Sequence, residues 1–113
     1  MDIVIKQYMK ASEQLIHEGF YRQSINLSWI ALRLTIFRWL KYKGISYNSS
    51  RDAFLKIIQY FSQDRISSNL CFLDTISTLC EWDENFNIDI SSAKHFHELC
   101  RDIIKQFYDE FLM

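Results

Sequence analysis

The sequence predicts an all-α fold, an up-and-down bundle of about five helices, on three observations. Only two glycines and no proline interrupt the 113 residues. Each glycine follows a long stretch with helical periodicity, residues 2–18 before Gly19 and residues 21–43 before Gly44. Glycine is common just after a helix end, because it adopts the left-handed conformation without strain. The chain is 49% hydrophobic, which is enough for one compact core, so we expect a single domain over residues 1–113.

The first helix is expected over residues 2–18, because its apolar positions recur every three or four residues. These positions are Val4, Tyr8, Ala11 and Leu15, with Ile5, Met9, Ser12 and Ile16 beside them. The second helix, over residues 20–42, is apolar around nearly its whole circumference. A helix of this kind is buried on nearly every side. Either it forms the interface with a second copy of the chain, or it is the central helix of one chain.

Three further helices complete the bundle. Asn48, Ser49 and Ser50 are good N-cap residues for a third helix that ends near Gln63. A fourth helix is expected over residues 65–82, and a polar, acidic loop over residues 83–90. Ser91 or Ser92 is expected to cap the last helix, whose apolar face continues almost to the end of the chain. The residues of that face are Ala93, Phe96, Cys100, Ile103, Phe107 and Phe111.

A narrow polar strip runs along the second helix. Arg22, Asn26 and Arg33 fall within roughly 40° of one another on a helical wheel, and Trp29 borders them. A buried guanidinium group needs a partner, because leaving it unpaired costs several kcal/mol, on the order of 3–5. Carboxylates of the C-terminal half are the expected partners. They are Glu81, Glu84, Glu98 and Asp102. A contact with a phosphate group or RNA is the alternative.

The two halves of the chain differ in net charge. Residues 1–65 carry ten Lys or Arg against five Asp or Glu, and residues 66–113 carry three against nine. This asymmetry indicates either complementary packing of the two halves or a dipolar surface. Aromatic side chains flanked by acids around residue 82 are candidate exposed contacts, or else hinge packing. The candidate interface residues are Arg22, Asn26, Trp29, Arg33, Phe37, Glu81, Trp82, Glu84 and Phe86.

Several function classes lack sequence support. Cys71, Cys80 and Cys100 form no CxxC pair and are expected to be reduced core thiols of a cytoplasmic protein. The chain shows no signal peptide, no apolar run of about 18 residues and no cofactor-binding motif. His95 and His97 point roughly 200° apart on a helix, so they cannot chelate one metal. We therefore expect no cofactor, no metal and no membrane insertion.

The order of elements resembles the HEPN domain family, small prokaryotic helical bundles often encoded beside a minimal nucleotidyltransferase. The likeness rests on Gly19-Phe20-Tyr21-Arg22-Gln23-Ser24-Ile25 before the long second helix. It also rests on the aromatic and acidic loop Asn85-Phe86-Asn87-Ile88-Asp89 before the last helix. The resemblance extends over essentially the whole chain. It implies a homodimer and a role in a toxin–antitoxin or defence module.

Many members of that family cleave RNA through an Arg-x(4–6)-His motif near the end of the fourth helix. No histidine of this chain follows an arginine at that spacing, and the matching stretch carries Glu81 and Glu84 instead. Their negative charge would repel an RNA phosphate. We therefore expect a non-catalytic, dimeric interaction protein that pairs with a nucleotidyltransferase. The alternatives are a ribonuclease that uses Arg33 with His95 or His97, and an unrelated structural or interaction protein.

Overall fold

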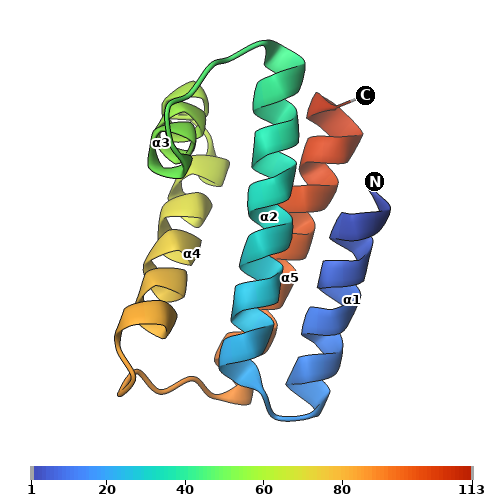
Figure 1. The fold of residues 1–113 in the computed structure, drawn as a ribbon, viewed down its shortest axis with the longest axis vertical. Helices are drawn as coiled ribbons and strands as arrows, with labels where there is room; N and C mark the ends of the chain where they lie inside the picture. Colours follow the sequence, from blue (N-terminus) through green and yellow to red (C-terminus); the bar gives the residue numbers. More distant parts are fainter. Residues whose placement is uncertain (1, 113) are drawn as a thin grey trace.

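The computed structural model describes residues 2–112 and arranges them as a bundle of helices (Figure 1). The helices are α1 (Ile3–His17), α2 (Tyr21–Lys43), α3 (Ser50–Tyr60), α4 (Arg65–Trp82) and α5 (Ile90–Gln106), followed by the π-helical turn η1 (Phe107–Phe111). The described residues form no strand. The all-α bundle predicted from the sequence is confirmed, and the predicted bounds of the fourth helix agree with α4. The molecule measures 39 × 27 × 24 Å.

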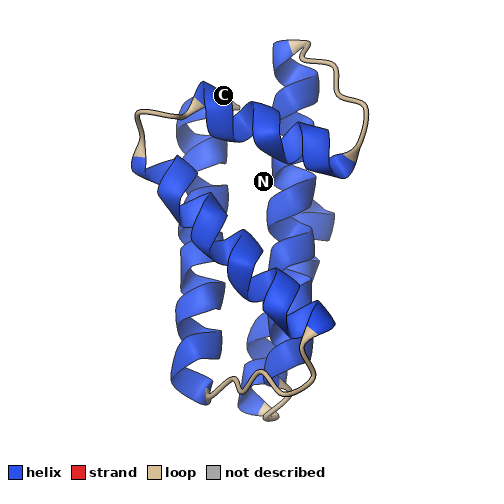
Figure 2. Ribbon diagram, turned by 90° about the vertical axis from the view of Figure 1, so that its left-hand side faces the viewer, coloured by secondary structure: helices blue, strands red, loops and turns tan. Residues whose placement is uncertain are grey.

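Helix α2 is the centre of the bundle. Helices α1 and α5 lie along one side of it, and α3 and α4 lie on the other side. Seen from that second side, α4 runs obliquely over the bundle and α3 crosses it near one end (Figure 2). Because α3 lies across the bundle, the α1–α2 turn and the loop between α4 and α5 lie at the same end, which is the end away from α3 (Figure 1). This arrangement leaves α3 and α4 facing α2 across a common groove.

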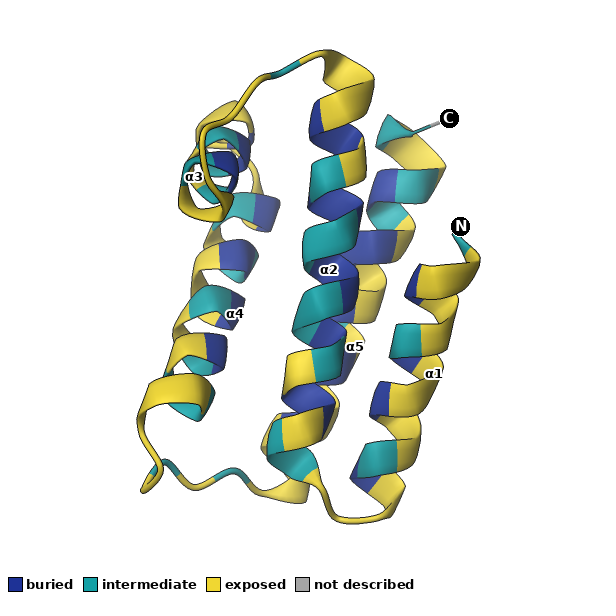
Figure 3. Ribbon diagram, viewed as in Figure 1, coloured by how far each residue is buried: buried dark blue, intermediate teal, exposed yellow. Residues whose placement is uncertain are grey.

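The central position of α2 accounts for its apolar circumference. No large apolar side chain between residues 21 and 41 is exposed, whereas Phe20 and Tyr42, just beyond this stretch, are 50% and 58% exposed. Helix α2 contacts all four other helices, but one of its faces stays half-buried or exposed (Figure 3). On this face Asn26 and Arg38 are exposed, and Ile30 and Leu34 are half-buried. The structure therefore shows α2 as the central helix of one chain. An interface between its half-buried face and a second copy stays a prediction.

The helix ends follow local chemistry. Gly19 and Gly44 have φ values of 85° and 70° and end α1 and α2, as predicted. After α2, the Ile45 amide donates to the Leu40 carbonyl at 2.9 Å, which satisfies an end carbonyl of the helix. Ser49 caps α3 as expected. The cap of α5 is not Ser91 or Ser92. It is Asp89, whose carboxylate accepts from the Ser92 amide at 2.7 Å.

The buried face of α1 is rotated from the predicted one. Its buried residues are Ile5, Met9, Ser12 and Ile16. The predicted primary stripe is only partly covered, since Val4 is 43% exposed and Ala11 is also exposed. The physical reason is that α1 contacts both α2 and α5. The face of α1 that is turned toward these two helices is therefore the one that becomes buried.

The expectation for the cysteines is only partly correct. Cys100 on α5 is fully buried, and Cys80 near the end of α4 is half-buried. Cys71 is exposed, because it lies on the side of α4 that turns away from α2. All three thiols are free. Only one side of α4 therefore packs on the core, although apolar residues occur on more than one side of this helix.

Candidate functional site

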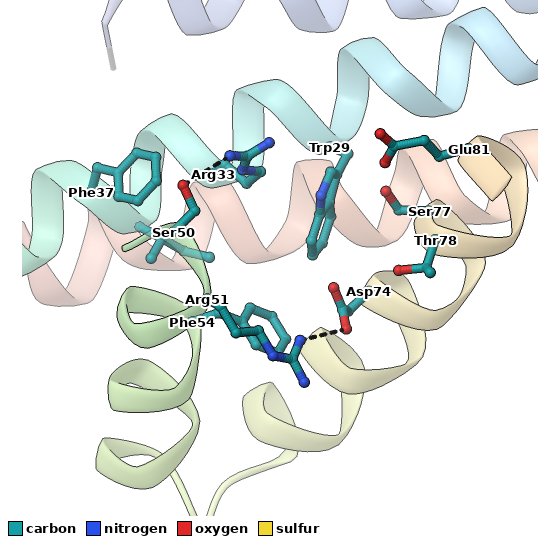
Figure 4. Close-up of a pocket in the computed structure, with 11 residues that line it drawn as sticks. Trp29, Arg33, Phe37, Ser50, Arg51, Phe54, Asp74, Ser77, Thr78 and Glu81 are labelled. Carbon is teal, nitrogen blue, oxygen red and sulfur yellow. Dashed lines mark hydrogen bonds and ion pairs between the residues drawn. The ribbon is translucent and has the colours of Figure 1, made fainter. Parts of the chain in front are cut away.

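A groove between α2, α3 and α4 is the main candidate binding site. It encloses a cavity of about 190 Å³ and combines aromatic, charged and hydroxyl side chains (Figure 4). Its lining residues come from all three helices and are Trp29, Arg33, Ile36, Phe37, Ser50, Arg51, Phe54, Asp74, Ser77, Thr78 and Glu81. Four of the predicted contact residues, Trp29, Arg33, Phe37 and Glu81, are thus brought together. We call this region the α2–α4 groove.

Trp29 forms the aromatic wall of the groove. Its ring centroid lies 6.2 Å from that of Phe54 on α3 and 6.5 Å from that of Phe96 on α5, with tilted ring planes. Such tilted contacts are favourable for aromatic pairs, because ring edges meet ring faces. They hold the indole in place while leaving part of it at the cavity. The groove therefore has a rigid apolar surface on which a ligand can pack.

Arg33 is held beside this wall by neutral groups. Its guanidinium donates to the Ser50 hydroxyl at 3.3 Å and lies 5.9 Å from the centroid of the Phe37 ring. Phe37 in turn stacks on Tyr47 at 5.6 Å. Among residues 2–112, no carboxylate forms an ion pair with Arg33. The predicted pairing of Arg33 with an acid of the C-terminal half is therefore not observed.

Arg51 and Asp74 form the charged bridge between α3 and α4. The guanidinium lies 3.2 Å from the carboxylate and 5.5 Å from the centroid of the Phe54 ring. The two side chains are 66% and 29% exposed, so water screens the pair and its contribution to stability is small. Its main effect on the groove is electrostatic, because each charge neutralises the other.

The opposite wall comes from the last turns of α4. Ser77 is buried, whereas Thr78 and Glu81 are exposed at the mouth of the cavity. Arg33 and Glu81 lie on opposite sides of the Trp29 side chain (Figure 4). Within the described part of the chain, neither takes part in an ion pair. The groove thus presents one positive and one negative side chain that do not neutralise each other.

Arg22 fixes the end of α4. Its guanidinium donates to the carbonyls of Cys80 at 2.6 Å and Asp83 at 2.9 Å, and also to the carbonyl of Phe86. The last carbonyls of a helix have no partner within the helix, and they carry its negative dipole end. A guanidinium with several donors satisfies them well. The predicted ion pair of Arg22 with a carboxylate is wrong, because backbone carbonyls take its place.

The segment that Arg22 holds is acidic and carries an exposed tryptophan. Trp82 is 79% exposed, and Glu81, Asp83 and Glu84 around it are exposed as well. We call residues 81–84 the acidic end. Trp82 is therefore an exposed aromatic side chain rather than part of a packed hinge. Phe86, by contrast, is half-buried.

Three other residues considered from the sequence, Asn26, His95 and His97, do not line the α2–α4 groove. Asn26 is exposed on α2 and has no part in the cavity. His95 borders a different small cavity beside Phe72, with ring centroids 6.0 Å apart. His97 is buried on the α1 side of the bundle. The structure thus separates Arg33 from both histidines that the ribonuclease alternative would need.

His97 belongs to a buried polar cluster that was not predicted. Its Nδ1 atom lies 3.0 Å from the Ser12 hydroxyl oxygen and 3.3 Å from that of Ser28, and Ser12 also contacts Ser24 at 2.9 Å. All three serines are fully buried, and His97 is 8% exposed. Burial lowers the pKa of His97, because the imidazolium form loses its hydration. This cluster joins α1, α2 and α5 through buried hydrogen bonds.

No protein-family model, no curated protein sequence and no solved structure matches this chain. None of the described helices has the length and apolar character required to cross a membrane.

Proposed function

We propose that this chain is a non-catalytic protein-interaction module and that the acidic end contacts its partner. The observation that carries the proposal is the 79% exposure of Trp82 among carboxylates. Tryptophan is strongly enriched among residues that dominate binding energy at protein interfaces, since it buries a large area on contact. The surrounding carboxylates favour a partner surface with basic residues. Arg22 keeps this segment in one conformation, which reduces the entropic cost of binding.

The partner class is proposed from the resemblance to the HEPN family. We propose that the partner is a minimal nucleotidyltransferase of a toxin–antitoxin or defence module in the cytoplasm. This step rests on the motifs at residues 19–25 and 85–89. The Arg-x(4–6)-His motif of the RNA-cleaving members is absent from the chain. A role as the binding member of such a pair is consistent with that absence.

Affinity purification from the source cells tests the proposal. The tagged wild-type chain is compared with Trp82→Ala and Glu84→Lys, and co-purified proteins are identified and quantified by mass spectrometry. Tyr42→Ala and Asp109→Lys are matched controls, because both residues are exposed and lie outside the acidic end. We expect a nucleotidyltransferase at stoichiometric amount with the wild type and the controls, and a loss of at least about tenfold with either acidic-end variant.

The two parts of the proposal fail in different ways. A different stoichiometric partner that depends on Trp82 would retain the interaction module and remove the nucleotidyltransferase. Recovery of the wild-type chain without a partner, or equal recovery with all variants, would remove the role of the acidic end.

A homodimer is part of the same proposal, and it is tested separately. Light scattering of the purified chain should give twice the 13.7 kDa of one copy. The contact proposed for the dimer is the half-buried face of α2 that carries Ile30 and Leu34. A mass of one copy at micromolar concentration would show that the chain is monomeric.

A further inference from the structure

The α2–α4 groove combines three features that bear on ligand binding. It encloses a cavity of about 190 Å³, it has an aromatic wall at Trp29, and it carries opposite charges at Arg33 and Glu81. A cavity of this size has room for several water molecules. Waters against an apolar ring are released at a gain in free energy when an apolar group replaces them. The cavity is therefore suited to a small ligand with an apolar body.

The charges of the groove select the polar groups of that ligand. Arg51 and Asp74 neutralise each other at 3.2 Å, and they leave Arg33 and Glu81 as the charges available to a ligand. A simple anion would pair with Arg33 and leave the exposed Glu81 to water, and a simple cation would make only the contact with Glu81. A ligand that carries both charges satisfies both side chains. Such pairing strengthens as the ligand excludes water from the cavity.

The positive side is arranged for a carboxylate. The Arg33 guanidinium is fixed by the Ser50 hydroxyl and the Phe37 ring, and it retains donors for a second acceptor. Guanidinium and carboxylate groups match in geometry and form two parallel hydrogen bonds. The Ser50 hydroxyl lies at the same place and can donate to the same ligand group. The carboxylate of the ligand thus pairs with Arg33, which forms no ion pair with a carboxylate of the described chain.

The negative side is arranged for an ammonium group. Glu81 is exposed at the mouth of the cavity, and Thr78 on the same face of α4 adds a hydroxyl acceptor. Arg33 and Glu81 form no ion pair with each other, so the ligand must span the gap between them. One peptide residue spans at most about 3.6 Å. An amino acid or a short peptide has the required order of groups, with charged ends and an apolar side chain.

We propose that the α2–α4 groove binds a zwitterionic ligand of the amino-acid or short-peptide class. Its carboxylate contacts Arg33 and Ser50, its ammonium group contacts Glu81, and its apolar side chain lies against Trp29. Glu81 belongs to both this site and the acidic end, whereas Arg33, Ser50 and Trp29 belong to this site alone. Arg33→Gln therefore tests the site without changing the acidic end.

Calorimetric titration of the purified full chain tests the site. The probes are phenylalanine, glycyl-phenylalanine and glycyl-glycyl-phenylalanine, and each is compared with its N-acetylated and C-amidated forms. We expect one of the free zwitterions to bind best, and its length identifies the ligand source. Blocking either end should weaken binding about tenfold or more, since each removes a charge-assisted hydrogen bond.

Two variants assign each charge of the ligand to its side chain. Arg33→Gln should weaken binding of the free zwitterion. It should also abolish the difference in affinity between probes with a free carboxylate and probes with a C-terminal amide. Glu81→Gln should abolish the difference in affinity between probes with a free ammonium group and N-acetylated probes. Arg101→Gln and Glu110→Gln are matched controls, because both residues are exposed and lie outside the cavity. Circular dichroism of each variant verifies the fold.

Three results would overturn the proposal. The first is that no probe binds to the folded wild-type chain at millimolar concentration. The second is that blocked and free probes bind equally well. The third is that inorganic phosphate binds as tightly as the zwitterions and depends on Arg33 alone, which would define a simple anion site.

Discussion

The Nδ1 atom of His97 on α5 lies 3.0 Å from the hydroxyl oxygen of Ser12 on α1, inside the bundle. The contact crosses 85 positions of the sequence and joins the first helix to the last. Glu13 on α1 and Glu98 on α5 raise the pKa of His97, but burial, aided by Arg101 on α5, outweighs them and lowers it. The cluster is therefore suited to a neutral imidazole.

Stability should consequently decrease in mildly acidic solution. Burial lowers the pKa of His97 in the folded state below its ordinary value of 6.5. Between these two pKa values the unfolded chain binds more protons than the folded chain, so the free energy of unfolding falls as pH falls. The contribution is complete above pH 6.5, and it is lost progressively below that pH. Urea denaturation at closely spaced pH values between 5 and 8 measures this slope.

His97→Gln provides the comparison, because it removes the titrating group and retains hydrogen-bonding capacity. The variant should show a flatter profile between pH 6.5 and pH 5, although its stability at pH 8 is lower. His95→Gln is the control, since His95 is exposed on the same helix. An unchanged slope in His97→Gln would show that other groups cause the pH dependence.

The clamp at the end of α4 gives a second prediction. Arg22→Met should lower the free energy of unfolding by about 2 kcal/mol, because a charged donor to three carbonyls is lost. Arg22→Lys should lie between the variant and the wild type, since an ammonium group retains the charge but not the planar fork. Urea denaturation gives the values. Arg101→Met is the control, and an equal loss in that exposed position would contradict the special role of Arg22.

The backbone after α2 gives a third prediction. Gly44 has φ of 70°, and a Cβ atom there would meet nothing within 4 Å. Gly44→Ala should therefore destabilise the chain through strain alone, by about 1 kcal/mol. Gly44→Asn should cost less, because asparagine tolerates the left-handed region. Thermal unfolding compares them with Ser46→Ala, an exposed position in the following turn; a neutral Gly44→Ala would refute the strain argument.

The fold could be predicted from the sequence because its determinants are local. Gly19 and Gly44 end helices through their own conformational freedom, and the bounds of α4 follow from the polar residues on either side. The face of α1 was harder to predict. Two adjacent apolar stripes fit the same spacing, and the choice of the stripe with Ile5 and Met9 depends on contacts with both α2 and α5.

The candidate site was predictable only in part. Trp29, Arg33 and Phe37 follow one another at helical spacing, so their common location in the groove could be expected. The partners of Arg22 could not be predicted, because they are backbone carbonyls, which every type of residue carries. The cluster of His97 was missed for a similar reason. Its available signal was Ser24 and Ser28, one helical turn apart, opposite a serine in the apolar stripe of α1.

The three cysteines give a last prediction, based on accessibility. Cys71 is exposed and should react first with iodoacetamide. Cys80 should react more slowly, because burial raises its pKa more than the nearby Arg22 lowers it. Burial raises the pKa of Cys100 much further, and no path to reagent exists while the bundle is folded. Since the thiolate is the reactive form, Cys100 should be modified only in urea.

Mass spectrometry of peptides from a labelling time course separates the three sites. The native chain should show modification in the order Cys71, Cys80 and Cys100, and the urea-unfolded chain should show nearly equal rates. The unfolded sample is the internal control, because it removes burial and leaves the local sequence unchanged. Modification of Cys100 as fast as Cys71 in the native chain would require frequent opening of α5 from α2. That result would contradict a core in which the two helices are closely packed.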